Sequence, residues 1–346
     1  MRNFSRLAMG VLAGLAVSAA APAYAQETTI RVAEADTFSG EDLIQLIAYE
    51  KAAERGVTIA SVALKSDDVT FQAVLNGQAD VGVGDAYEAI ANLKAPIRHF
   101  FQVRKLAYIP VVDKTLYKTW KDLDGQPFAV HSRGSGTETL AQIIQATHGI
   151  KFSEITYVPG SEVRVVAMQR GNIKATLLDL TTSKMLMEGD PEKFGTLPAG
   201  EQVATDSAYY TRTEFLEENA EAVQILIEEL IKAARAVNED PTFAAAERER
   251  LGLLADLPPE AVEEIAPFHE QAVAAGIFPV DGGGEAAAKA DIAFLGTAGK
   301  LTDPATQTPE QFWDFGPLNA ALAALGDSPA QPGSKPAEAA GETNSN

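Results

Sequence analysis

The chain has 346 residues, of which 46% are hydrophobic and 22% are charged, a composition typical of a globular protein long enough for two domains. Its formal charge of −20 argues against binding to nucleic acid or to an anionic membrane, because both would be repelled. The sequence contains no cysteine, so it offers neither a disulfide framework nor a site for lipid attachment to cysteine.

The segment 1–25 has the features of a secretory signal peptide. Arg2 and Arg6 form a basic start, and Leu7–Val17 is an apolar run too short to span a membrane. Ala23–Ala25 is an A-x-A cleavage site, which makes Gln26 the expected first residue of the mature chain. Cleavage would remove two arginines and no acid, so the mature chain would carry −22. We therefore expect export to the periplasm.

The mature sequence opens with a strand–helix–strand–helix–strand pattern, which predicts a parallel α/β sheet. These elements are Thr28–Ala33, a helix that follows the capping box Ser39–Asp42, Val57–Leu64, Asp67–Asn76 and Ala79–Gly84. The apolar, extended segment Phe100–Val112 is interpreted as a crossing into a second lobe.

A second set of the same kind follows. Its elements are Pro127–His131, Leu140–Ala146, Ile155–Val158, Ser161–Arg170 and Ile173–Asp179. The chain is expected to cross back near Ala204–Thr211 and then to be mainly helical. The organisation predicted is a signal peptide at 1–25, lobe 1 at 26–110, lobe 2 at 111–205, a return to lobe 1 with C-terminal helices at 206–326, and a disordered tail at 327–346.

Several helices are predicted in residues 206–326, where the chain returns to lobe 1. Val223–Ala234 has apolar residues at the spacing of one helix face. Further helices are expected at Pro259–Ala275 and Gly284–Phe294, and an amphipathic segment ends near Leu325.

An internal repeat links the two lobes. The segment 71–86 returns 94 positions later as 165–180, with three identities: Ala73 and Ala167, Gly77 and Gly171, Asp85 and Asp179. Each copy predicts a helix end, a glycine stop, a short strand and an aspartate where the strand ends. Ligands of open α/β sheets bind outside the carboxyl ends of strands, so Asp85 and Asp179 are expected to face one cleft. The alternative is that the match is chance and each aspartate caps the next helix.

The loop Ser132–Thr137 is the sharpest local signal for a ligand. It joins a strand to a helix N-terminus, where free N–H groups and the helix dipole favour an anion. Gly134 and Gly136 would let a ligand approach the backbone, Ser132, Ser135 and Thr137 would add hydroxyls, and Arg133 would pair with an acid group. In the alternative reading, Ser135 and Glu138 form a capping box and Arg133 points into solvent.

Outside the repeat and this loop, the sequence offers fewer candidates for contact with a ligand. Asp36, Thr37 and Phe38 follow the first strand, and Phe38 and Tyr87 could give apolar faces to a ligand unless they pack in the core. Asp85 and Asp179 could accept hydrogen bonds from a ligand amine. The four histidines lack metal-ligand spacing, and we expect neither a metal nor a cofactor.

Three segments carry a family resemblance. "NGQADVGVGD", "DLDGQPFAVHSRGSGTETL" and "YYTRTEFLEENAEAV", in this order and spacing, resemble the solute-binding proteins of ABC importers over about residues 28–280. The most similar branch binds alkanesulfonates, taurine, nitrate or bicarbonate, aromatic carboxylates and thiamine pyrimidine precursors. One departure is Lys174, which stands where this branch often has aspartate in a Gly-x-x-Asp-Ala segment.

The resemblance implies a type II periplasmic binding protein with two α/β lobes, two hinge crossings and a cleft between them. It maps the ligand loops onto 36–39, 85–87 and 132–137. We expect a monomer that binds a small organic anion or zwitterion, without nucleic acid, and delivers it to the transmembrane subunits of an ABC permease. Two alternatives are an enzyme of the pyrimidine-precursor type on the same fold and a periplasmic ligand sensor that partners a membrane receptor.

Overall fold

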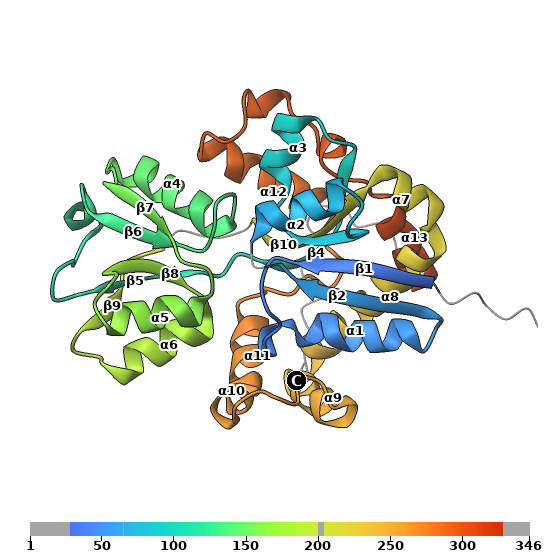
Figure 1. The fold of residues 1–346 in the computed structure, drawn as a ribbon, viewed down its shortest axis with the longest axis horizontal. Coiled ribbons are helices and arrows are strands. Elements are labelled where there is room, and N and C mark those ends of the chain that lie inside the picture. The colour runs from blue at the N-terminus through green and yellow to red at the C-terminus, as the bar shows by residue number, and fades with distance from the viewer. Residues whose placement is uncertain (1–27, 65, 200–203, 328–346) are drawn as a thin grey trace, which may run out of the picture.

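The computed structural model describes residues 28–64, 66–199 and 204–327, and these form two α/β lobes side by side (Figure 1). The predicted signal peptide and all but the first residue of the predicted tail lie outside the described residues. Within the described ranges, no helix is both long and apolar enough to cross a membrane.

The first lobe is built on a five-stranded sheet in the order β2-β1-β3-β10-β4. The strands β1, β2 and β3 are parallel, as the alternating segments predicted, and β10 runs antiparallel to both of its neighbours. The bounds are Thr28–Glu34 (β1), Val57–Ala63 (β2), Val81–Gly84 (β3), Ile97–Lys105 (β4) and Thr205–Arg212 (β10).

The second lobe repeats this plan in a sheet of order β7-β6-β8-β5-β9. Here β6, β7 and β8 are parallel, and β5 is antiparallel to β8 and β9. The bounds are Ile109–Asp113 (β5), Pro127–Val130 (β6), Glu154–Tyr157 (β7), Ala175–Leu178 (β8) and Phe194–Thr196 (β9).

The antiparallel strand in each sheet is the one that arrives from the other lobe. The predicted crossing 100–112 is therefore two strands, β4 and β5, joined by three residues, rather than one extended linker. The chain returns as β10 at the predicted position. Both sheets are consequently mixed and not purely parallel, because an incoming strand runs against the strands that the lobe forms from its own sequence.

Helices cover both faces of the first sheet, and two apolar clusters lie under them. The predicted stripe of Val223–Ala234 is buried in the long helix α8, which packs against α1 and α13. The helices of this lobe are Leu43–Ala53 (α1), Asp67–Leu75 (α2), Tyr87–Leu93 (α3), Thr213–Glu218 (α7), Ala220–Glu239 (α8), Phe243–Leu251 (α9), Pro259–Glu263 (α10), Ile265–Ala274 (α11), Gly284–Thr297 (α12) and Gly316–Ala324 (α13).

The second lobe has one helix on one face and two on the other. Gly136–His148 (α4) covers a cluster that includes Leu123 and Phe128, while Ser161–Gln169 (α5) and Leu180–Gly189 (α6) cover a smaller cluster around Val111. Each helix of this lobe thus begins where a strand of the sheet ends.

The internal repeat is visible in the backbone. Gly77 and Gly171 have φ of +70° and +72°, and each donates to the residue three positions earlier, Val74 and Met168, at 3.1 and 3.0 Å. Glycine is favoured in this left-handed conformation, which ends α2 and α5 in the same way. The helix stop and strand that the sequence pattern predicted are therefore confirmed in both copies.

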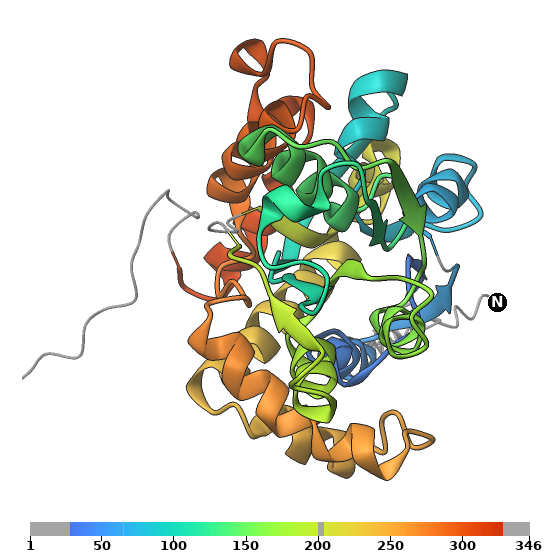
Figure 2. The same cartoon turned by 90° about the vertical axis from the view of Figure 1, so that its left-hand side faces the viewer.

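The helices α10 and α11 leave the first lobe and lie below the junction of the two lobes (Figures 1 and 2). There α11 contacts both α6 of the second lobe and the turn Gly40–Asp42. A Cβ at Gly40 would lie 2.7 Å from Ile265 Cγ1, so the close approach of α11 depends on glycine at this position.

Candidate ligand-binding cleft

A cleft of about 660 Å³ lies between the lobes. Its walls are the loop that follows β1, the hinge strands β4 and β10, the N-terminal ends of α4, α5 and α6, and the helices α10 and α11. This volume falls in the range of sites for small organic molecules.

The first wall contains three of the predicted residues, Asp36, Thr37 and Phe38, all of which line the cleft. The Asp36 carboxylate accepts a hydrogen bond from the Thr37 backbone N–H at 2.9 Å, and the ring of Phe38 meets Tyr49 edge-on. Asp36 and Thr37 are exposed, so their polar atoms are open to a solute.

Glu34, the last residue of β1, also lines the cleft but is buried. Its Oε1 accepts hydrogen bonds from the Tyr49 hydroxyl at 3.0 Å and from Gln45 Nε2 at 3.3 Å. Burial, reinforced by the nearby carboxylate of Asp42, raises the pKa of Glu34 to about 8. The carboxyl group is therefore mostly neutral at pH 7. The sequence analysis did not identify Glu34, although it is the polar end of an apolar strand.

The hinge carries an arginine that is already paired. Arg104 at the end of β4 donates from Nη1 to Asp42 Oδ1 at 2.9 Å and from Nε to Asp206 Oδ2 at 2.7 Å. These bonds join the two hinge strands to the turn that begins α1. Arg104 thus holds the hinge region and has its charge balanced within the protein.

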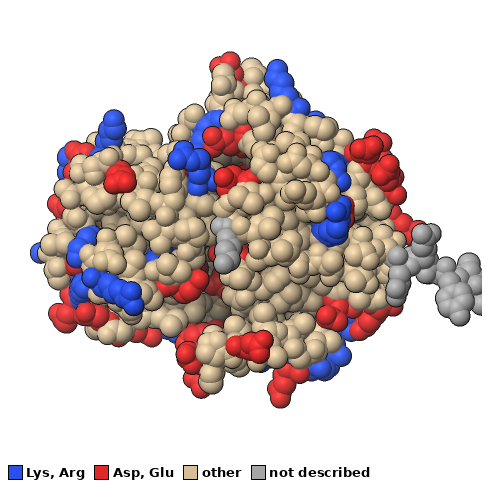
Figure 3. All heavy atoms as spheres, in the orientation of Figure 1, with Lys and Arg blue, Asp and Glu red and all other residues tan. Residues whose placement is uncertain are grey.

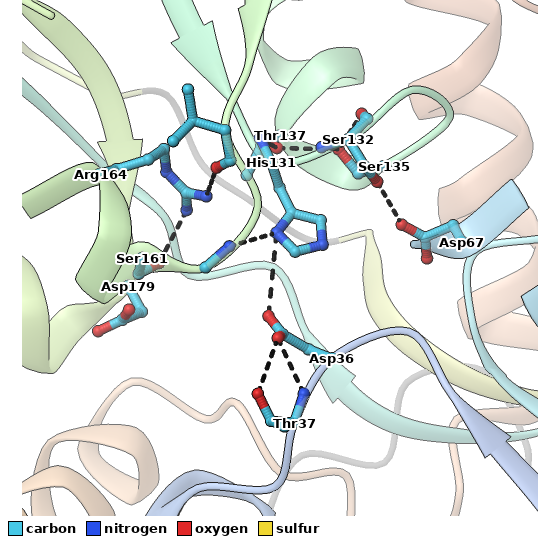
Figure 4. Close-up of polar contacts among 12 residues, drawn as sticks. Asp36, Thr37, Asp67, His131, Ser132, Ser135, Thr137, Ser161, Arg164 and Asp179 are labelled. Carbon is cyan, nitrogen blue, oxygen red and sulfur yellow. Dashed lines mark hydrogen bonds and ion pairs between the residues drawn. The ribbon is translucent and has the colours of Figure 1, made fainter. Parts of the chain in front are cut away.

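On the second lobe, Arg164 of α5 lines the cleft although its side chain is almost fully buried. It donates to the carbonyls of Leu177 at 3.1 Å and Val158 at 2.9 Å, and to Ser161 Oγ at 2.8 Å (Figure 4). Burial lowers the pKa of this guanidinium. The sequence analysis did not identify Arg164. The signal that could have identified it is a charged residue four positions before Met168, on the buried face of the helix.

Asp179 lies beside this arginine and lines the cleft, as predicted. It also caps α6, because its Oδ1 accepts from the Thr182 backbone N–H and its Oδ2 from the Thr182 hydroxyl, both at 2.7 Å. Thr181 Oγ1, in the same turn, is buried without a hydrogen-bond partner among the described residues. Capping and a place in the cleft are therefore compatible for Asp179.

The loop 132–137 turns only part of itself to the cleft. Ser135 and Gly136 line it, and Ser135 Oγ caps α4 by accepting from the Glu138 backbone N–H at 3.4 Å. Ser132 and Thr137 are buried outside the lining. Ser132 donates across the lobes to Asp67 Oδ2 at 2.9 Å, and Thr137 Oγ1 accepts from the His131 backbone N–H at 2.9 Å (Figure 4). The capping reading thus describes the loop better than an open anion site.

Arg133 and Gly134 are also outside the lining of the cleft. Arg133 is exposed, and its guanidinium lies over the ring of Tyr157, 5.0 Å from the centroid. Gly134 donates its N–H to Glu138 Oε2 at 2.9 Å. The structure therefore places the arginine of the Gly/Ser loop on the surface of the second lobe.

Asp85 and Tyr87 lie behind the first wall rather than in it. Asp85 accepts from the Tyr87 backbone N–H at 3.0 Å, and burial raises the pKa of Asp85 to about 7. Tyr87 is in the core and donates to Asp291 Oδ2 at 2.6 Å. Gly84, which has φ of +147°, and Asp67 of α2 line the cleft, whereas Asp85 does not. The two repeat aspartates are thus not brought together.

The charge of the cleft is strongly unbalanced. Its lining includes ten carboxyl side chains but only two arginines, one of which is Arg104 with two carboxylate partners. Carboxylates are visible in the groove between the lobes (Figure 3). Burial and the nearby Asp179 raise the pKa of Glu41 well above its usual value. Apolar side chains complete the lining, including Phe38, Val165, Ile265 and Phe268.

Two α/β lobes, each with one strand that arrives from the other lobe, and a cleft between them are the fold of type II periplasmic binding proteins. The chain belongs to the NMT1/THI5-like family, whose model matches residues 47–244. No match to a curated protein sequence was found. Among the described residues, no group of His, Cys, Asp and Glu is arranged to hold a metal ion.

Solved structures support the fold at low sequence identity. A protein of Bordetella bronchiseptica RB50 is 19% identical with a TM-score of 0.68, over 87% of this chain and 98% of that one. The alkanesulfonate-binding protein SsuA from Xanthomonas axonopodis pv. citri, bound to MOPS, is 17% identical with a TM-score of 0.59, over 84% and 99%. The periplasmic nitrate-binding protein NrtA from Synechocystis PCC 6803 is 13% identical with a TM-score of 0.61, over 86% and 89%.

Proposed function

We propose that this chain captures a small organic solute in the periplasm and delivers it to the transmembrane subunits of an ABC permease. The observation that carries the proposal is the 660 Å³ cleft lined by both lobes and by the strands that connect them. The relationship to the NMT1/THI5-like family and the fold shared with SsuA and NrtA support it. The chain would act as a monomer and without a cofactor.

The ligand would be a zwitterion or an organic anion that also carries a polar or cationic group. The excess of carboxyl groups in the cleft favours the zwitterion, because these groups attract a cationic end of the solute. Asp36 and Asp179 would hold an amine, Thr37, Ser135 and Gly136 would give neutral polar contacts, and Phe38 an apolar face. An aminosulfonate, an amino acid or a heterocyclic precursor would fit this description.

Capture would depend on closure of the lobes around the solute. A ligand that contacts both walls stabilises the closed state by its additional contacts there. Polar contacts already join the lobes: Ser132 with Asp67 at 2.9 Å, Lys300 with Glu138 at 3.0 Å, and His131 with Asp36 at 3.9 Å.

One observation supports a second candidate function. Glu34 is a cleft carboxyl group whose raised pKa would suit it to proton transfer, as in an enzyme of the pyrimidine-precursor type. Incubating the protein with each compound that it binds, followed by mass spectrometry for products, distinguishes the two functions. Unchanged compound supports binding, and conversion that is lost in Glu34→Gln supports catalysis.

Thermal unfolding of the protein after unfolding and refolding to remove carried ligand tests the proposed function. The panel would contain sulfonates, carboxylates, amino acids, pyrimidines, nitrate and bicarbonate. A solute at about 100 times its Kd stabilises the folded state by about 2.7 kcal/mol, which gives a clear rise in midpoint. A saturable rise with one class of organic solute is expected. No rise with any compound would count against solute capture.

A further inference from the structure

Arg164 is a buried cation whose contacts are all to neutral groups. The exposed fraction of the residue is 1%, and its three hydrogen bonds end on two carbonyl oxygens and one hydroxyl. No carboxylate of a described residue forms an ion pair with it within 4.0 Å. Burying a charge without a counter-ion is costly, so such residues usually have a partner that is charged.

Part of this guanidinium is left without a hydrogen bond among the described residues, and the side chain lines the cleft. A guanidinium has five N–H groups, and the three bonds to Leu177, Val158 and Ser161 use three of them. Arg164 is itself part of the cleft lining, and Figure 4 shows it on the second lobe, apart from Asp36 and Thr37 on the first. Two N–H groups in a planar fork match the oxygens of a carboxylate or sulfonate.

The start of α5 adds donors at the same place. Its N-cap is Gly160, which has no side chain to accept from the first-turn N–H groups, and Ser161 and Glu162 line the cleft. Ser161 Oγ accepts from Arg164, so its own O–H remains to donate to a solute. The positive end of the helix dipole acts in the same direction.

Arg104 and Arg133 are less suited than Arg164 to bind the acid group of a solute. Arg104 is paired with Asp42 and Asp206, and Arg133 lies over Tyr157 outside the cleft. Asp36, Asp179 and Glu162 influence Arg164 from a longer range than an ion pair, so Arg164 is the arginine of the lining that has no carboxylate partner among the described residues.

We propose that Arg164, the Ser161 hydroxyl and the first-turn N–H groups of α5 form an oxyanion subsite that binds the carboxylate or sulfonate of the solute. This inference rests on the proposed function. The subsite orients the solute with its acid group on the second lobe and its cationic end toward Asp36 and Asp179. The expected substrate is therefore a small zwitterion with one oxyanion group.

The test uses inorganic sulfate as the probe, since it offers the oxyanion and nothing else. The unfolding midpoint of the refolded protein is followed during titration with sodium sulfate and, as a blank, with sodium chloride at equal ionic strength. Arg164→Gln is compared with Arg133→Gln, which removes the same charge from the same lobe outside the cleft. If Arg164→Gln does not fold, Arg164→Lys, which keeps the charge but not the fork, replaces it.

We expect a saturable sulfate effect above the chloride blank in the wild type and in Arg133→Gln, and at least tenfold weaker sulfate binding in the Arg164 variant. An equal sulfate effect in the Arg164 variant, or none in the wild type, would overturn the subsite. A panel compound that binds equally to Arg164→Gln and to the wild type would also overturn it, while leaving the proposed function standing. A sulfate effect lost in the Arg164 variant would support the subsite even if no organic solute bound.

Discussion

At the scale of single residues, burial changes which hydrogen bonds Glu34 can form in the cleft. Glu34 ends strand β1 of the first lobe, accepts hydrogen bonds from Tyr49 and Gln45, and is uncharged over much of the physiological pH range. A neutral carboxyl group can donate a hydrogen bond to a solute, which an ionised one cannot. Glu34 therefore offers a solute a hydrogen-bond donor in the same wall as the Asp36 carboxylate.

Glu34 also predicts a dependence of stability on pH. Its folded-state pKa of about 8 is above the unfolded value, so the folded protein binds the extra proton between about pH 4.5 and 8. The stability that this proton contributes is present below that window and is lost as the pH rises through it. The free energy of unfolding in urea should consequently fall from pH 5 to pH 8, and less steeply in Glu34→Gln.

The matched control for this prediction is Glu50→Gln, an exposed glutamate of the helix α1 in the same lobe. Its pH profile should follow that of the wild type. Equal slopes for the wild type and Glu34→Gln between pH 5 and 8 would show that Glu34 is ionised in the folded protein.

At the scale of elements, the sequence predicted most of the strands and helices because each has its own local pattern. The glycine stops at Gly77 and Gly171 and the apolar stripe of α8 each depend on a few neighbouring residues. The division of the first crossing into β4 and β5 was not predicted, since both strands are apolar and the turn between them is set by the packing of two lobes.

The site was predicted less completely, for a physical reason. Asp36, Thr37, Phe38, Ser135, Gly136 and Asp179 line the cleft. Whether a side chain after a strand faces the cleft depends on one or two backbone angles, and Asp85, which follows Gly84 with its φ of +147°, lies outside the lining. Arg164 was overlooked because an arginine in a helix is normally on the solvent side. That these residues contact ligand remains a proposal.

The strand β3 gives a prediction about packing. Gly82 is buried between Ala33 and Tyr210 on the neighbouring strands, and a Cβ at this position would overlap the ring of Tyr210. Tyr210 is fully buried, so the ring has little room to move. Gly82→Ala should lower the free energy of unfolding by about 1–3 kcal/mol in urea denaturation.

Gly189→Ala is the control for that substitution. Gly189 ends α6 with no atom near the position of an added Cβ, so alanine should be neutral or stabilising by up to about 1 kcal/mol. Equal losses in both variants would mean that Tyr210 does not limit the space at Gly82.

At the scale of the whole molecule, Lys300 couples the two lobes. It follows α12 in the first lobe, is nearly buried, and pairs with Glu138 of α4 at 3.0 Å and with Glu88 of α3 at 3.1 Å. Lys300→Met would leave the buried Glu138 without its cation. We expect a loss of about 3 kcal/mol in stability and a larger radius of gyration in small-angle scattering of the ligand-free protein.

Lys289→Met serves as the comparison, because Lys289, in the preceding helix α12, is exposed and forms its ion pair with the half-exposed Glu285. It should change stability by less than about 0.5 kcal/mol and leave the radius of gyration as in the wild type. A Lys300→Met protein with unchanged dimensions would show that this contact does not hold the lobes together.

Calorimetric titration of two tryptophan variants tests most directly whether the solute binds between the lobes. Val165 and Val163 are both on α5, but Val165 lines the cleft whereas Val163 is 49% exposed outside it. With the panel compound that gives the largest thermal shift, the wild type and Val163→Trp should bind one molecule per chain with equal affinity. Val165→Trp, which fills part of the cleft, should bind at least tenfold more weakly. Unchanged affinity in Val165→Trp would contradict the central claim, because the solute would then bind elsewhere on the protein.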